Sequence, residues 1–247
     1  VGGTTRVREL SVERSACDLP AALVRSSAPV LAEGGGFDPL QATDPSVLAT
    51  AGSATRVAFV AAQGLASAPH AIWVGELGAD GRVPVAEAVV TVAELSAVAT
   101  GMVVTDVGGP HLYEDGATIS MYFAFETDDD RWRLARLADL DGARAITVLP
   151  VAEGSFDDPA RMPDGDLIAR ERLAGGGSRI VLLQLGPEAT RASNLCASET
   201  DCGAGRPDDY LHATSPDPLA FDHDEVRGPA VLVHDGVTRI YFAGRRG

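Results

Sequence analysis

A short phrase recurs four times along this 247-residue chain, and it constrains the fold more than any other feature of the sequence. Pro-Val-Ala-Glu, once with an inserted Leu, starts at Pro29, Pro84 and Pro150, and a weaker form, Pro-Leu-Ala, starts at Pro218. The intervals between these prolines are 55, 66 and 68 residues, and each leaves room for about four short strands. A repeat of this size is typical of a β-propeller blade. In a β-sandwich, the alternative, turn signals would recur without a shared phrase.

Each repeat has the same internal order of a Pro-led segment, a turn and a strand. The Pro-led segments start at Asp44-Pro45, Gly109-Pro110, Asp158-Pro159 and Gly228-Pro229. Asp-Gly pairs follow at 115–116 and 235–236, and Asp-Gly between apolar stretches is a strong hairpin signal. In the second repeat we expect strands over 111–113, 119–125, 132–137 and 146–149. The sequence therefore predicts an all-β fold of four-stranded blades, with four clear repeats.

The two ends of the chain complement each other. After Pro218 only two strands are expected, over 230–233 and 239–242, whereas residues 6–12 and 22–24 are strand-like and precede the first repeat. A propeller must protect the edge strands of its terminal blades. We therefore expect N- and C-terminal strands to share one blade and close the ring, so that residues 1–247 form a single domain.

Two segments do not fit the four-strand pattern. For residues 88–107, which are rich in Ala and Val, three interpretations stay open: an extra strand pair, an inserted helical turn or a degenerate blade fragment. Residues 194–225 are polar, which predicts a long surface loop. Cys196 and Cys202 lie in it at a spacing that suits a small disulfide loop, whereas two thiols without nearby His make a poor zinc site. A disulfide favours an extracytoplasmic location: secreted, periplasmic or on the cell surface.

Composition limits the partners. The chain is 45% hydrophobic, enough for a sizeable core, but contains no run of about eighteen apolar residues that would cross a membrane. Its formal net charge is −15, and such an acidic surface repels phosphate backbones, so nucleic acid is not an expected partner. All 20 basic residues are Arg, which we attribute to a GC-rich bacterial genome.

The repeats also resemble a known group. The segment from Pro29 through Phe37-Asp38 to Asp44-Pro45-Ser-Val-Leu48 looks like the five-bladed propeller glycosidases, a clan of arabinanases, β-xylosidases and invertase-like enzymes. Residues 228–244 resemble the later blades of these enzymes equally well. The resemblance implies five blades, one more than the four clear repeats.

The resemblance further implies three acidic positions. Glycoside hydrolysis needs one protonated and one ionised carboxyl group at the scissile bond. Asp44 matches the position of the base in the first blade. The equivalent place in the second blade is Gly109, with Asp106 three residues earlier as a candidate modulator of pKa. The third blade offers Asp158 where the family has Glu, and Glu225 in the fourth is a second candidate acid. The competing interpretation is that Asp before Pro only caps a turn.

Other polar and aromatic residues give weaker signals. His111, just after Pro110, and Trp73, in a strand pattern, are candidates for substrate contact, with ordinary strand packing as the alternative. We expect no cofactor, because the five His lack metal-ligand spacing. His223, which lies between two Asp residues, and the acidic run 128–130 are candidates for a structural Ca²⁺, although acidic turns of this kind are usually only solvated.

Three classes of function follow from these signals. The first is a carbohydrate-active propeller, possessing glycoside hydrolase activity if Asp44 and a second carboxyl group face one central funnel. The second is a non-catalytic propeller that binds a glycan or a cell-surface protein. The third is a structural subunit of a cell-surface assembly.

Overall fold

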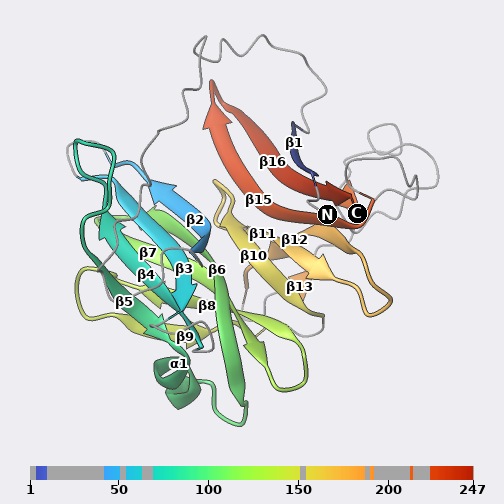
Figure 1. Cartoon of the computed structure of the whole chain (residues 1–247). Helices are drawn as coiled ribbons and strands as arrows, with labels where there is room; N and C mark the ends of the chain where they lie inside the picture. Colours follow the sequence, from blue (N-terminus) through green and yellow to red (C-terminus); the bar gives the residue numbers. More distant parts are fainter. Residues whose placement is uncertain are drawn as a thin grey trace.

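The computed structural model describes residues 4–9, 42–50, 54–62, 69–150, 154–186, 190–191, 212–213 and 223–246, and it confirms the all-β prediction. Four antiparallel sheets follow one another along the chain, and one short helix accompanies them (Figure 1). No helix in the described ranges is long and apolar enough to span a membrane.

Each sheet is a run of strands that are neighbours in sequence. The first contains β2 (Thr43–Leu48), β3 (Arg56–Ala62), β4 (His70–Glu76) and β5 (Ala86–Thr91). The second contains β6 (Val104–Asp115), β7 (Thr118–Thr127), β8 (Trp132–Ala138) and β9 (Ala145–Val148). The third contains β10 (Phe156–Arg161), β11 (Leu167–Arg172), β12 (Ser178–Gln184) and β13 (Thr190–Arg191), with β14 (His212–Ala213) also paired to β12. The fourth contains β15 (Glu225–His234), β16 (Val237–Arg246) and β1 (Thr4–Glu9).

The predicted strands of the second repeat are confirmed, although β6 begins seven residues before the predicted start at His111. The predicted Asp-Gly hairpins are also present. Asp235 and Gly236, between β15 and β16, have φ of 51° and 73°, and two successive left-handed residues match the twist of a two-residue hairpin. Local turn chemistry therefore sets the register of this pair, from His234 opposite Val237 onward.

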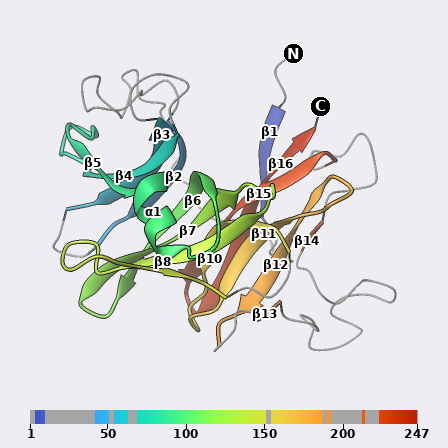
Figure 2. The same cartoon turned by 90° about the horizontal axis from the view of Figure 1, so that it is seen from below.

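Strands from opposite ends of the chain share the fourth sheet. β1 pairs antiparallel with β16, from Thr4 opposite Arg246 to Glu9 opposite Tyr241 (Figure 2). The N-terminal strand thus covers the outer edge of the C-terminal hairpin, as the need to protect an edge strand predicts. The second predicted N-terminal strand, over 22–24, lies outside the described residues.

Residues 88–107 contain an inserted helix and no extra strand pair. They include most of β5, the helix α1 (Val92–Val98) and the first residues of β6. Thr91 caps the helix, because its side chain accepts a hydrogen bond from the Glu94 N–H while the Glu94 side chain accepts one from the Thr91 N–H. Leu95 is fully buried in the core between the first two sheets.

The phrase that defined the repeat does not occupy equivalent places. The segment that starts at Pro84 leads into β5, the last strand of the first sheet, whereas Pro150 follows β9 and lies beyond the second sheet. A short run of Pro, Val, Ala and Glu fits either setting. The equivalent feature is the Asp-Pro or Gly-Pro pair, which lies inside β2, β6, β10 and β15, whereas the strands expected over 111–113 and 230–233 began only after it.

Successive sheets pack face to face. One buried cluster lies between the first and second sheets, with Val60, Ile72, Phe123 and Phe125 among its members. A second joins the second and third sheets and contains Tyr122 and Phe156, and a third joins the third and fourth sheets. The first strands of the sheets also contact one another in order, β2 with β6, β6 with β10 and β10 with β15. This packing brings the four Pro-containing strands to one centre.

Candidate active site

The first strand of every sheet carries the same irregularity. Asp44, Gly109, Asp158 and Gly228 each precede Pro, and their φ angles are 49°, 54°, 48° and 57°. At each of them the register with the next strand shifts, as in a β-bulge. Pro cannot donate a hydrogen bond and is tolerated in sheets mainly at edges and bulges, while left-handed φ suits Gly and, less well, Asp. Two bulges therefore use Gly, and two use Asp.

The four bulges surround one pocket of about 580 Å³. Its lining contains all four Asp-Pro and Gly-Pro pairs together with Ser46, His111 and Arg227. Ser46 also joins two sheets, because its hydroxyl accepts a hydrogen bond of 3.0 Å from the Leu112 N–H. The pocket thus combines side chains from sheets that are far apart in sequence.

Asp44 and Asp158 lie on either side of a pair of glycines. A Cβ on Gly108 would lie 3.9 Å from Oδ2 of Asp44 and 3.1 Å from the Trp132 ring. A Cβ on Gly109 would lie only 3.0 Å from the backbone N and Cα of Asp158. The missing side chains of β6 therefore let the two Asp-bearing bulges approach from both sides.

The environment of Asp158 favours its protonated form. Burial, followed by the negative charge of Asp157, raises the pKa of Asp158 to about 6, and Asp44 adds to the rise. Arg170 and the Gly228 N–H act in the opposite direction. Arg170 Nε lies 3.5 Å from Oδ2 of Asp158, and the Gly228 N–H donates a hydrogen bond of 3.0 Å to the same oxygen. Asp158 can therefore hold a proton in mildly acidic water.

A cluster of ion pairs around the buried Arg170 lies next to the Asp158 carboxyl group. Arg170 is 8% exposed and bonds through two nitrogens to Asp157, which is 2% exposed and also contacts Arg172. A third nitrogen of Arg170 bonds to Glu225, whose other oxygen lies 3.3 Å from Arg245 Nε. Glu225, predicted as a candidate acid, is thus bound within this cluster and does not line the pocket.

His111 lines the pocket, as expected for a substrate contact. Burial and the positive charge of Arg161 lower its pKa to about 4, so the imidazole is neutral at physiological pH. The guanidinium of Arg161 stacks over the Tyr113 ring at 4.9 Å. His111 can therefore donate or accept a hydrogen bond but adds no charge.

Two other predicted residues lie elsewhere. Asp106 contacts Nδ1 of His70 at 2.9 Å, on the side of β6 that faces the first sheet. Trp73 is 7% exposed, and its indole N–H donates to the Ala61 carbonyl at 3.2 Å. It packs in a cluster within the first sheet, as the strand-packing alternative predicted. Neither residue lines the pocket.

The other predicted features give no site within the described ranges. Cys196, Cys202 and Asp222 lie outside them, as does most of the predicted 194–225 loop. No group of three or more His, Cys, Asp or Glu side chains in the described ranges could hold a metal ion. In the acidic run 128–130, Asp129 accepts a hydrogen bond from Thr127 and forms an ion pair with Arg133.

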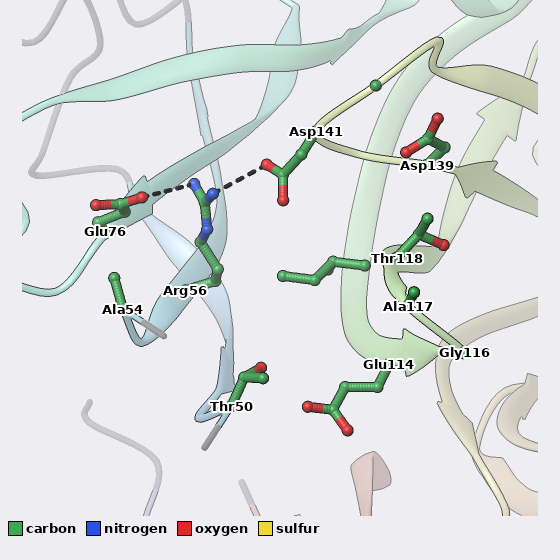
Figure 3. A pocket seen from close by; sticks show the side chains of 12 residues that line it. Thr50, Ala54, Arg56, Glu76, Glu114, Gly116, Ala117, Thr118, Asp139 and Asp141 are labelled. Atoms are coloured by element: carbon green, nitrogen blue, oxygen red, sulfur yellow. Dashed lines mark hydrogen bonds and ion pairs between the residues drawn. The ribbon is translucent and has the colours of Figure 1, made fainter. Parts of the chain in front are cut away.

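A second pocket, of about 510 Å³, lies between the first sheet and the turns at 116–118 and 139–142 of the second (Figure 3). Arg56 joins the two sides, 3.2 Å from Glu76 and 2.9 Å from Asp141. None of the predicted site residues in the described ranges lines this pocket, so the candidate site is the one at the four bulges.

Two solved structures share the fold with TM-scores of 0.52 and 0.50. BT0996, solved as a complex with RGII, has a TM-score of 0.52 and 12% identity, over 87% of the present sequence and 72% of BT0996. Trypanosoma rangeli sialidase with 2,3-difluorosialic acid has a TM-score of 0.50 and 13% identity, over 81% of the present sequence and 33% of the sialidase. A GH43_1 enzyme from Xanthomonas citri with xylotriose has a TM-score of 0.49 and 14% identity, over 86% of the present sequence and 67% of the enzyme. The protein has a propeller fold.

The propeller prediction is thus confirmed at the level of the fold, and the sheets are called blades from here on. No protein-family model matches the sequence, and no curated protein matches it.

Sequence reasoning missed three features of the site. Gly108, the buried Arg170 and the pocket-lining Arg227 were not singled out. For Arg227 a signal existed, because it precedes Gly228-Pro229 as Asp157 precedes Asp158-Pro159. For Arg170 there was none, since its partners Asp157 and Glu225 belong to other strands.

Proposed function

We propose that this protein is a carbohydrate-active propeller that hydrolyses glycosides, with Asp158 as general acid and Asp44 as general base. One observation carries the proposal. Two bulges that Gly would satisfy hold Asp instead, and both of these residues line one pocket. A left-handed backbone costs an L-residue about 1–2 kcal/mol, so a carboxylate at such a position suggests a use for its side chain.

The different surroundings of the two Asp residues suit opposite roles. Asp158, with its pKa raised to about 6, can donate a proton to the glycosidic oxygen as the bond to the anomeric carbon breaks. Asp44 is exposed and can accept a proton from the water that attacks that carbon. His111 and Ser46 are placed to hydrogen-bond sugar hydroxyls in the same pocket.

We extend the proposal to the number of blades in the ring and to the cellular location of the protein. Four blades are described, and β1 covers the edge of the fourth. We propose a five-bladed ring in which the shared terminal blade provides closure, and an exported protein with a disulfide between Cys196 and Cys202. Titration of free thiols in unfolded protein before and after reduction tests the disulfide.

The test of the hydrolytic reaction compares the wild type with Asp44→Asn and Asp158→Asn on arabinan, xylan and fructan. General acid–base catalysis contributes about 10²–10⁴-fold, so each variant should lose at least about 100-fold in kcat/KM. Asp128→Asn, an exposed matched control, should keep full activity. Wild-type kcat/KM should fall as the pH rises above about 6, because Asp158 loses its proton there. Hydrolysis that survives both active-site variants would exclude this mechanism.

A non-catalytic, glycan-binding propeller is the second candidate, and a specific observation favours it. The resemblance implies three acidic positions, but the second blade has Gly109 at the equivalent place and Glu225 is bound to Arg170 and Arg245. A glycan that binds to the wild type without being cleaved, and more weakly to Asp44→Asn, would support this function in place of hydrolysis.

A further inference from the structure

Arg227 is the cation of the candidate active site. It lines the pocket immediately before the Gly228 bulge, opposite Ala243 of β16. Its side chain is exposed, and no described residue forms a hydrogen bond or ion pair with it. In blade three the corresponding residue, Asp157, is buried and bonded to two arginines. The same place in two blades is thus filled once by a buried, paired charge and once by an exposed charge with no partner in the described ranges.

Two of the three carboxylates near Arg227, those of Glu225 and Asp158, already have partners, and the third, Asp44, forms no ion pair with it within the described ranges. Glu225, two residues earlier on the same face of β15, is held by Arg170 and Arg245. Asp158 accepts the Gly228 N–H and lies beside Arg170. Asp44 shares the pocket but forms no ion pair with Arg227 within the described ranges. The guanidinium therefore keeps its hydrogen-bond donors available to a ligand.

We infer that Arg227 binds an anionic group on the sugar, so that the substrate class is acidic glycans; this rests on the proposed carbohydrate site. The planar guanidinium can donate two parallel hydrogen bonds to the carboxylate of a uronic acid or to a sulfate ester. A neutral sugar can accept hydrogen bonds from the guanidinium but offers it no opposite charge. The protein's net charge of −15 repels anions in general, so a local cation is needed for an anionic sugar to enter.

The test measures dissociation constants by calorimetry or NMR titration for pairs of sugars in which one carries the anionic group and the other is neutral. One arm uses methyl glycosides of glucuronic and galacturonic acid against their methyl esters. The other uses glucose and galactose 6-sulfates against glucose and galactose. At least one charged sugar should bind about tenfold more tightly than its neutral partner, and the preference should weaken with added salt. The arm that shows the preference identifies the anionic group.

Variants separate Arg227 from the general charge of the protein. Arg227→Gln should abolish the preference, and Arg227→Lys should keep part of it, because charge remains without the two-donor geometry. Arg82→Gln removes the same charge from an exposed turn and should change nothing. The inference is wrong if no charged sugar is preferred, or if the preference survives in Arg227→Gln.

The outcome is independent of catalysis, because binding is measured without turnover. An anion preference that depends on Arg227, in a protein that cleaves no glycoside, would support the inference and refute hydrolysis. If the protein cleaves neutral glycans, Asp158→Asn abolishes that cleavage and no anionic sugar is preferred, hydrolysis is supported and the inference about Arg227 is refuted.

Discussion

The bulges of β2 and β10 have the same backbone and the same residue pair, yet they place their carboxylates in different surroundings. Asp44 and Asp158 have φ of 49° and 48°, and each precedes Pro. Asp44 is exposed, whereas the Asp158 side chain is only 15% exposed. Asp158 also accepts a hydrogen bond from the Gly228 N–H and lies 3.5 Å from Nε of the buried Arg170. Identical local chemistry therefore places two carboxyl groups in unlike environments, and the difference comes from the neighbouring blades.

The bulges of β6 and β15 extend the comparison. They use Gly at the same left-handed position, but only Gly109 is also confined by a neighbour, the backbone of Asp158. Among the described residues, nothing lies within 4 Å of the position that a Cβ on Gly228 would take. Backbone conformation explains both glycines, and close packing against Asp158 adds a second reason for Gly109.

The largest effect should separate these two glycines. Gly109→Ala should lower the free energy of unfolding by about 3 kcal/mol, the sum of left-handed strain and a forced shift of Asp158. Gly228→Ala should cost only about 1 kcal/mol, from strain alone. Chemical denaturation measures both. Equal losses would show that the contact with Asp158 is not restrictive.

The second effect concerns the pH dependence of stability. The folded pKa of Asp158, about 6, lies above its ordinary value of 3.8, so its contribution to stability is present below about pH 4 and is lost as the pH rises through 6. Asp158→Asn mimics the protonated form. The stability of the wild type relative to this variant should fall by about 2–3 kcal/mol between pH 4 and pH 7. A difference that stays constant with pH in denaturant titrations would contradict the raised pKa.

The smallest effect should distinguish chemistry from turn geometry at Asp44. Asp44→Gly keeps a residue that tolerates left-handed φ, so the free energy of unfolding should change by less than about 1 kcal/mol. Hydrolysis should nevertheless be lost. If the variant unfolds more than about 2 kcal/mol more easily in denaturant, Asp44 serves the fold as a turn cap.

Local patterns predicted much of the fold. Alternating apolar residues placed β7 and β8 within two residues, and the Asp-Gly pairs placed the hairpins. The repeated phrase that includes Pro84 did not mark equivalent positions in the sheets, because a four-residue run of Pro, Val, Ala and Glu can precede a strand or follow one. The Asp-Pro and Gly-Pro pairs were the informative repeat, since Pro in a sheet is confined mainly to edges and bulges, and here each pair lies at a bulge in the first strand of its sheet.

The candidate site was predicted in part for the same reason. Asp44, Asp158 and His111 belong to the bulges or follow them, and the structure brings all three together. Asp106 and Glu225 were expected there from their positions, but His70 and Arg170 bind them instead. Those partners come from other strands, and sequence spacing does not report which side chains face one another across a sheet.

The amino-acid sequence by itself determined the strands, their hairpins and the four recurring Asp-Pro and Gly-Pro pairs, because each depends on near neighbours in the chain. Only the tertiary structure decided which Asp is the less exposed, which arginine lines the pocket and which glycines leave room for two carboxylates. Those properties depend on desolvation and charge between blades, which act through space and are invisible in any single repeat.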